Sequence, residues 1–192
     1  MASKVKIGLI GLFLISFISH GTAQVTVSTQ NSHSTYTINQ DGLNQFKISV
    51  KGKVDISDDD KDVVAVSSGG HLEISKTSFG SKREIRIEGK VAGLSKAYYV
   101  GSKKVDWDPE GKEWLAEILP EVLRSSGIGA ESRVDRFYAK GGVESVMDEI
   151  NSIQSDYVKS IYSNLLFQQK MSSSEIVGLL NFVGEEISSD YY

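Results

Sequence analysis

The spacing of the hydrophobic residues changes near Trp107, and this change limits what the 192-residue chain can fold into. Before Trp107, hydrophobic and polar residues alternate, and many of the hydrophobic ones are β-branched or aromatic, as over residues 46–50. A period of two predicts strands with one buried face. Beyond Trp107 the hydrophobic residues recur every three or four positions, which predicts amphipathic helices. The sequence therefore predicts an α+β fold, with a small β domain over residues 24–107 and a helical region over residues 108–192.

The sequence leaves the arrangement of the predicted strands open. Turn-forming residues separate them at intervals of roughly 8–13 residues, which suits an antiparallel meander, a small sandwich or a stack of solenoid-like turns. Trp107 and Trp114 flank the change of pattern. Because Trp114 belongs to the apolar stripe of the first predicted helix, we interpret the pair as a hydrophobic latch between that helix and the sheet. The alternative is an aromatic platform for a sugar or a peptide.

The first 23 residues predict export from the cytoplasm. Lys4 and Lys6 precede an apolar stretch at 7–18, and the tripeptide at 21–23 supplies the small residues of a cleavage site. The apolar stretch is about 12 residues long, whereas a membrane-spanning helix needs about 20. We therefore predict a cleaved signal peptide and a periplasmic or secreted protein that begins near Gln24. The alternative is an uncleaved membrane anchor, and no later apolar run is long enough to span a membrane.

The composition excludes several classes of protein. The chain has no cysteine, so it forms no disulfide scaffold, zinc–thiolate site or cysteine nucleophile. Its formal net charge of −4 favours no contact with nucleic acid. The sequence contains neither a His-Glu-x-x-His motif nor a phosphate-binding loop. These absences point away from an enzyme and from nucleic-acid binding.

The helical region contains clear start and stop signals. Asp108 is a good N-cap before a proline, and Gly127 is a natural residue to end the first helix. Pro120 lies between these signals and should kink that helix or split it. A second helix is predicted over residues 130–140, because the glycine pair at 141–142 should stop it.

An internal repeat follows, with an offset of 34 residues. The matched positions are Val143 with Val177, Val146 with Leu180, Ile153 with Ile187, Ser155 with Ser189, Asp156 with Asp190 and Tyr157 with Tyr191. A period of 34 is typical of one helix-turn-helix unit. Since a solenoid needs about three units to be stable alone, we expect the sheet or a partner to support these helices.

Each repeat unit is predicted to hold two helices. The first helix covers residues 143–154, and Ser155 and Asp156 then cap a second helix. Serines at 172–174 cap the next unit, whose first helix ends near Ile187. A competing possibility is one helix that continues through Tyr157, because helical spacing is also kept there. The candidate partner-binding residues are Asp156, Tyr157, Tyr162, Asp190 and Tyr191.

One acidic run is the best candidate metal site. Its carboxylates are those of Asp58, Asp59, Asp60 and Asp62. Calcium binds several hard oxygens around one point, but the spacing of an EF-hand loop is absent. We favour the interpretation of this run as a solvated hairpin tip in which the aspartates cap a turn. No other cofactor is predicted, and we interpret His33 and His71 as polar residues of a mobile stretch and a turn, respectively.

Several strings together resemble a known family. They are Asp-Asp-Asp-Lys-Asp-Val at 58–63, Ser-Gly-Gly-His-Leu-Glu-Ile at 68–74, Trp-Leu-Ala-Glu-Ile-Leu-Pro-Glu at 114–121, Gly-Ile-Gly-Ala-Glu-Ser-Arg-Val at 127–134 and Ser-Asp-Tyr-Val-Lys-Ser-Ile-Tyr at 155–162. They resemble an uncharacterised bacterial extracytoplasmic family, related to the extracytoplasmic segment of BlaR-like membrane metallopeptidases with Ser-Asp-Tyr helical repeats. The catalytic zinc motif of those peptidases is not in this sequence. The resemblance therefore implies a sensing or interaction module of the envelope and no catalytic residue.

Three functions follow as hypotheses. The first is a non-enzymatic interaction or sensory accessory module of the bacterial envelope, which binds an envelope or membrane protein through the helical region. The second is a ligand-binding or adhesive β domain, for a glycan or for calcium. The third is a hydrolase whose carboxylates are dispersed along the sequence. We favour the first, because the predicted helices offer a surface for a protein partner.

Overall fold

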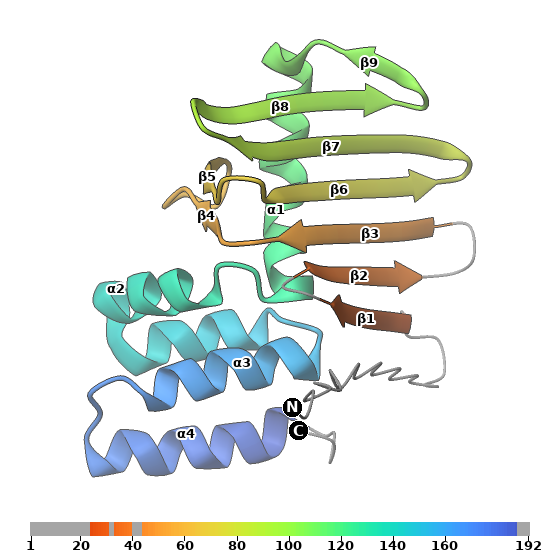
Figure 1. Ribbon diagram of the computed structural model, residues 1–192. Helices are drawn as coiled ribbons and strands as arrows, with labels where there is room; N and C mark the ends of the chain where they lie inside the picture. Colours follow the sequence, from red (N-terminus) through yellow and green to blue (C-terminus); the bar gives the residue numbers. More distant parts are fainter. Residues whose placement is uncertain (1–23, 31–32, 40–43, 188–192) are drawn as a thin grey trace, which may run out of the picture.

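The computed structural model of the protein describes residues 24–30, 33–39 and 44–187, and Figure 1 shows strands followed by helices. The strands are β1 (Gln24–Gln30), β2 (His33–Asn39), β3 (Asn44–Lys51), β4 (Val54–Ile56), β5 (Val63–Val66), β6 (His71–Ser78), β7 (Ser81–Lys90), β8 (Gly93–Val100) and β9 (Lys103–Val105). A short helical turn, η1 (Trp107–Gly111), follows the strands. The helices are α1 (Lys112–Ser126), α2 (Ala130–Asn151), α3 (Asp156–Phe167) and α4 (Ser173–Glu186). The predicted α+β fold is confirmed.

The main sheet is an antiparallel meander with one excursion. Its strand order is β1-β2-β3-β6-β7-β8-β9, and every neighbouring pair is antiparallel. Between β3 and β6 the chain leaves the sheet and forms the separate hairpin β4–β5. Of the three arrangements that the sequence left open, the described residues form the meander. Apart from β6, which pairs with β3, each later strand of the main sheet pairs with the strand that precedes it in the sequence.

One face of the sheet is apolar and is covered by α1. The alternation along the strands brings Ile48, Ile74, Ile85 and similar side chains to this face. α1 runs across the strands and packs its apolar stripe on them (Figure 1). The ring centroids of Trp114 and Tyr98 lie 5.6 Å apart, and Trp114 is buried. The latch interpretation of Trp114 is therefore confirmed.

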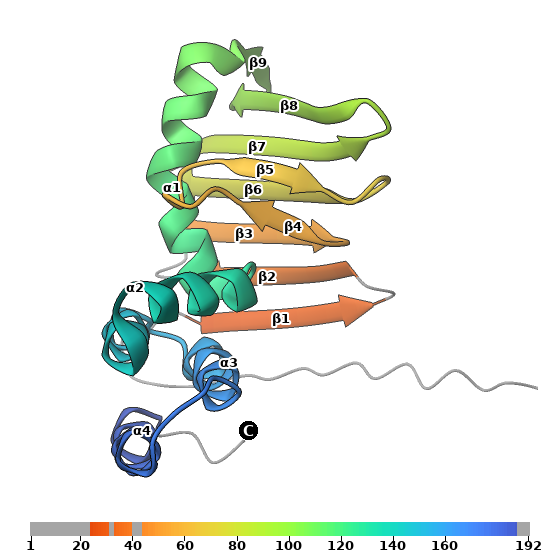
Figure 2. The ribbon, with the colours of Figure 1, turned by 90° about the vertical axis from the view of Figure 1, so that its left-hand side faces the viewer.

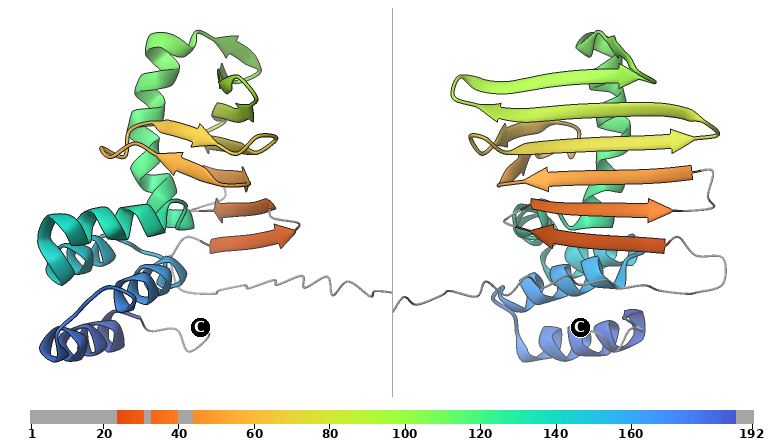
Figure 3. Two further views of the ribbon diagram at one scale, coloured as in Figure 1. Left: turned by 60° about the vertical axis from the view of Figure 1, so that its left-hand side comes forward. Right: turned by 45° about the vertical axis from the view of Figure 1, so that its right-hand side comes forward.

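The hairpin β4–β5 covers the same face beside α1. The right-hand view of Figure 3 shows both behind the sheet, and Figure 2 shows the hairpin alongside α1. Val54, Ile56, Val63 and Val66 of the hairpin are buried in one apolar cluster with the sheet and α1. We call this cluster the sheet core. It closes the apolar face without a second sheet of comparable size.

The start of α1 differs from the prediction. The regular helix begins at Lys112, and Asp108 instead lies within η1 with an extended backbone (φ −112°, ψ 122°). A Cβ added to the buried Gly111 would lie 2.8 Å from the Cβ of Tyr98. This close approach holds η1 against β8, so the chain follows the sheet for several residues before the helix begins.

Pro120 does not divide α1, which continues as one helix to Ser126. Of the two predicted outcomes, a kink or a split, the split is wrong. Leu119 and Leu123 flank the proline and are fully buried in the sheet core. Their packing outweighs the one backbone hydrogen bond that proline cannot donate. Gly127 ends the helix as predicted, with a left-handed backbone (φ 71°) and its N–H bonded to the carbonyl of Leu123.

Helices α2, α3 and α4 form a helical arm at the β1 end of the sheet (Figure 1). Gly141 and Gly142 interrupt α2, as predicted, with non-helical backbone angles. Ser155 is the N-cap of α3, and its hydroxyl accepts from the N–H of Val158. The chain therefore breaks before Asp156, and the competing helix through Tyr157 does not form.

The arm has an apolar cluster of its own, which we call the arm core. It contains Val143, Val146 and Ile150 of α2, Val158, Tyr162 and Leu166 of α3, and Leu179 of α4. The two cores divide at the turn between α1 and α2, whereas the sequence pattern changes near Trp107. Helix α1 belongs to the sheet core because the apolar face of the sheet needs its cover. Within the described residues, every helix is too short or too polar to cross a membrane.

Replacing Ser172 with alanine is expected to destabilise α4 locally by about 1 kcal/mol, a usual cost for losing an N-cap. The hydroxyl of Ser172 accepts from the N–H of Glu175 at 3.3 Å, and the Glu175 carboxylate accepts from the N–H of Ser172 at 2.7 Å. Amide hydrogen exchange in α4 measures the effect. Ser173→Ala, one residue later, is the matched control with a change below about 0.5 kcal/mol. Equal effects of the two substitutions would contradict the capping role.

Candidate functional site

The acidic run forms the tip of the β4–β5 hairpin. The hydroxyl of Ser57 donates to the Asp59 carboxylate at 2.7 Å and accepts from the N–H of Asp62 at 2.8 Å. Hydrogen bonds from Ser57 and from the N–H of Lys61 lower the pKa of Asp59. Asp60 occupies a left-handed backbone position (φ 57°) within this turn. The predicted hairpin tip is therefore confirmed as a turn, but it is not solvated throughout, because the Asp60 side chain is only 15 % exposed.

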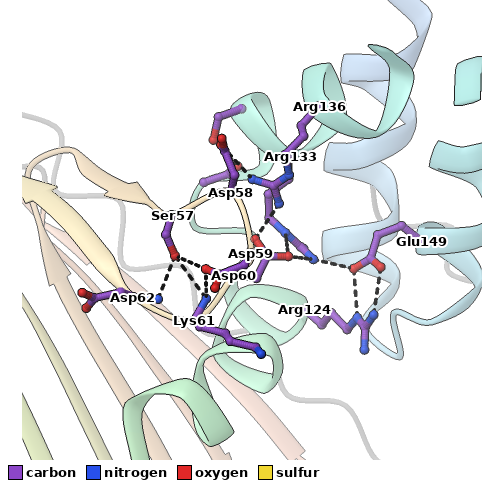
Figure 4. A network of polar contacts seen from close by, with 12 residues as sticks. Ser57, Asp58, Asp59, Asp60, Lys61, Asp62, Arg124, Arg133, Arg136 and Glu149 are labelled. Carbon is purple, nitrogen blue, oxygen red and sulfur yellow. Dashed lines mark hydrogen bonds and ion pairs between the residues drawn. The ribbon is translucent and has the colours of Figure 1, made fainter. Parts of the chain in front are cut away.

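The carboxylate of Asp60 binds two arginines of α2. Arg133 donates from Nε and Nη2 to Asp60 Oδ2 at 3.0 and 2.9 Å. Arg136 donates from Nη2 to the other oxygen, Oδ1, at 2.6 Å. Figure 4 shows the tip of the hairpin inserted toward these two guanidinium groups. Both oxygens of Asp60 are thus occupied by arginine, and the hairpin is joined to the arm.

Arg133 also links the part of α2 before Gly141 to the part after Gly142, and through these contacts to α1 and α3. Its Nη2 donates to Glu149 Oε1 at 2.9 Å, and its Nη1 donates to the hydroxyl of Tyr162. Arg124 of α1 binds the same Glu149 carboxylate through two hydrogen bonds of 2.9 and 2.8 Å. We call Asp60, Arg124, Arg133, Arg136, Glu149 and Tyr162 the Arg133 network. It connects the hairpin, α1, α2 and α3 at one point between the two cores.

The Arg133 network is largely buried, and its charges shift the ionisation of its members. Burial raises the pKa of Tyr162 to about 12, against the lowering effect of Arg133. Burial alone would lower the pKa of Arg133, but Tyr162, Asp60 and Glu149 raise it overall. Arg133 therefore stays positively charged and Tyr162 keeps its proton at neutral pH. Such an arrangement fixes the arm to the hairpin.

The geometry of the acidic run does not favour the candidate calcium site. Asp60 is paired with arginines, Asp59 is held in the turn, and Asp62 accepts from Lys96 Nζ at 2.6 Å. Asp58 is fully exposed, with Arg136 at 3.9 Å. Across residues 24–30, 33–39 and 44–187 no three His, Asp or Glu side chains gather as a set that could hold a metal ion. The four carboxylates point to different neighbours, so they do not surround one point.

The candidate partner-binding residues have different environments. Tyr162 is fully buried in the arm core, so it cannot contact a partner, and that part of the prediction is wrong. Asp156 is the first residue of α3, and the ring of Tyr157 is exposed beside it. Asp190 and Tyr191 lie outside the described residues. Of the five, Tyr157 and Asp156 stay candidates on the surface of the arm.

Comparison of the two repeat units identifies an exposed apolar surface on α4, which the sequence pattern alone does not indicate. Val143 and Val146 are 7 % and 0 % exposed in the arm core. Their counterparts one repeat later, Val177 and Leu180 of α4, are 57 % and 56 % exposed. Ile176 lies beside them and is exposed as well. We call Ile176, Val177 and Leu180 the α4 face.

The two histidines of the described residues lie in strands rather than in a mobile stretch and a turn. His33 begins β2 and His71 begins β6, and each is bonded to Ser49 of β3, which lies between them. Burial and the neighbouring His33 lower the pKa of His71. Both rings lie on the face of the sheet opposite the sheet core, and they line an open groove of about 310 Å³ with Thr35, Lys47, Ser49, Glu73 and Ser75.

The comparisons with known proteins add no relative. Protein-family models, curated proteins and solved structures all lack a match to this chain. The resemblance to the extracytoplasmic segment of BlaR-like peptidases therefore stays a prediction from the sequence. The function has to be argued from the surfaces of the molecule itself.

Proposed function

We propose that the protein is a non-enzymatic interaction module whose helical arm binds a protein partner through the α4 face. The observation that carries this proposal is the contrast between the two repeat units. The same apolar positions are covered by α3 in the first unit and are open to solvent in the second. Exposed apolar side chains gathered on one helix face are typical of an interaction site. The proposed envelope location rests on the predicted signal peptide.

The proposed occupant of the α4 face is an amphipathic helix of the partner. In the first repeat unit, α3 supplies such a helix with Val158 and Leu166 in the arm core. A partner helix with the same spacing of apolar residues would cover the α4 face in the equivalent way. Residues 171–186 contain Glu175, Glu185 and Glu186 and no lysine or arginine. We therefore expect basic residues to flank the apolar stripe of the partner helix.

The affinity of such a helix is expected to be modest. Full burial of one aliphatic side chain contributes about 1.5–3 kcal/mol, and the side chains of the α4 face are already partly covered. Their burial therefore contributes roughly 3–5 kcal/mol, and the entropy lost on association opposes it, so dissociation constants of about 1 mM or weaker are expected before charged contacts are added. A titration that detects weak binding is needed to test the proposal.

The test is an NMR titration of the ¹⁵N-labelled protein with a synthetic peptide of the α3 sequence, residues 155–167. This peptide has the pattern that covers Val143 and Val146 in the arm core. We expect saturable shifts centred on Val177 and Leu180, and at least a tenfold weaker binding with Leu180→Glu, because a carboxylate would then be buried. Val91→Glu is the matched control, since Val91 is an exposed valine of the β7–β8 turn.

Two outcomes would overturn the proposal. Shifts that leave α4 unaffected, or that persist in Leu180→Glu, would show that the α4 face does not bind helices of this kind. Self-association of the protein in sedimentation, abolished by Leu180→Glu, would instead assign the α4 face to a second copy of the chain.

A further inference from the structure

The open face of the sheet carries a site that is independent of the helical arm. β3 lies between β2 and β6, and Lys51 of β3 pairs with His33 on one side and with His71 on the other. Both histidine rings lean along the strands toward Ser49, two residues before Lys51. His33 Nε2 lies 2.7 Å and His71 Nε2 lies 3.2 Å from the same Ser49 Oγ. The coordinating nitrogens of two imidazoles therefore converge on one point.

The relative placement of the two rings matches that of two imidazoles on one metal ion. Their centroids are 5.0 Å apart and their planes lie at 88°. Zinc binds imidazole nitrogen at about 2.0–2.1 Å with tetrahedral geometry, which puts the centroids of two bound rings about 5 Å apart. The observed separation agrees with this value, so a shared ion would need little movement of either ring.

We propose that His33 and His71 bind one divalent transition-metal ion of the zinc or nickel class on the open face of the sheet. Imidazole is a preferred ligand of both metals. The Ser49 hydroxyl lies beside the proposed ion, and Glu73 lines the same groove, one strand across from Ser49. Within the described residues the two imidazoles are joined by no third His, Asp or Glu already in place. Water and a reoriented Glu73 complete the proposed coordination, and the site stays open toward solvent.

The test is isothermal titration calorimetry at pH 7.5 of the untagged protein from Gln24 onward, titrated with Zn²⁺ alone. We expect saturable binding of one ion per chain. His33→Gln and His71→Gln should each weaken it more than tenfold, since losing even an outer-shell partner of a metal ligand costs about 10–100-fold. Glu113→Gln is the control that should bind normally, because Glu113 is an exposed carboxylate of α1, away from the open face of the sheet.

A second measurement does not depend on the variants folding. In the unaltered protein, Zn²⁺ should shift the imidazole NMR signals of His33 and His71 together, with the same midpoint. The proposal is overturned by the absence of saturable binding up to 1 mM Zn²⁺, by binding that survives the double substitution of His33 and His71, or by binding that is lost in Glu113→Gln.

Discussion

Replacing Arg133 with leucine is expected to lower the free energy of unfolding by about 3–5 kcal/mol, the usual cost of removing one partner from a buried ion pair. Arg133 is 1 % exposed and binds Asp60, Glu149 and Tyr162. Without the guanidinium group, the buried Glu149 carboxylate keeps only Arg124, and Asp60 keeps only Arg136. The loss therefore comes from carboxylates left with fewer partners in a desolvated place.

Urea unfolding followed by circular dichroism measures this change. Arg83→Leu is the matched control, because Arg83 is an exposed arginine of β7, and its effect should stay within about 0.5 kcal/mol. The double variant Arg133→Leu, Glu149→Leu should lose less than the sum of the two single variants, since one buried carboxylate is then gone. A loss below about 1 kcal/mol in Arg133→Leu would show that the Arg133 network does not hold the arm in place.

Replacing Gly89 with alanine is expected to destabilise the protein by about 1–3 kcal/mol or more, the range for overpacking a filled site. A Cβ at Gly89 would lie 2.2 Å from the carbonyl oxygen of Ser67 and 2.4 Å from that of Val66. The N–H of Gly89 also donates to the carbonyl of Gly70 at 3.0 Å. Because these neighbours are backbone atoms, the end of β5 would have to move away from the sheet.

Thermal and urea unfolding of Gly89→Ala should be compared with those of Gly178→Ala. A Cβ at Gly178, inside α4, meets nothing within 4 Å. Alanine is the better helix former, so this control should stabilise the protein by up to about 1 kcal/mol. The two substitutions are therefore expected to change stability in opposite directions. A neutral Gly89→Ala would mean that the hairpin does not depend on its contact with β7.

Much of the fold is readable from the sequence because its signals are local. The period of two along the strands, the glycines at 127 and 141–142, and the serine caps at 155 and 172 each act within a few residues. The meander itself follows simple adjacency, since most neighbouring strands are also neighbours in the sequence. The sequence does not indicate that α1 begins at Lys112, because the contact between Gly111 and Tyr98 is not visible in the spacing of residues.

The candidate site could be predicted less well, because it depends on contacts between distant segments. The acidic run indicates either a metal site or a solvated turn, and nothing near it in the sequence indicates that Asp60 will meet Arg133. The available signal lies in the sequence around Arg133. This residue falls in an apolar helical stripe with Ala130, Val134 and Phe137, where an unpaired charge would be costly. In the same way, the spacing of His33 and His71 does not show that both flank Ser49.

The Arg133 network also has a consequence for the order of folding. Asp60 and Arg133 are 73 positions apart, so their pairing closes a long loop that costs more chain entropy than any hairpin of the meander. The hairpins are local and can form early, while the Arg133 network requires the hairpin tip, α1, α2 and α3 all to be in place. Interactions that form after the transition state act mainly on the unfolding rate. The network therefore determines chiefly how long the arm stays attached to the sheet, rather than how fast the sheet folds.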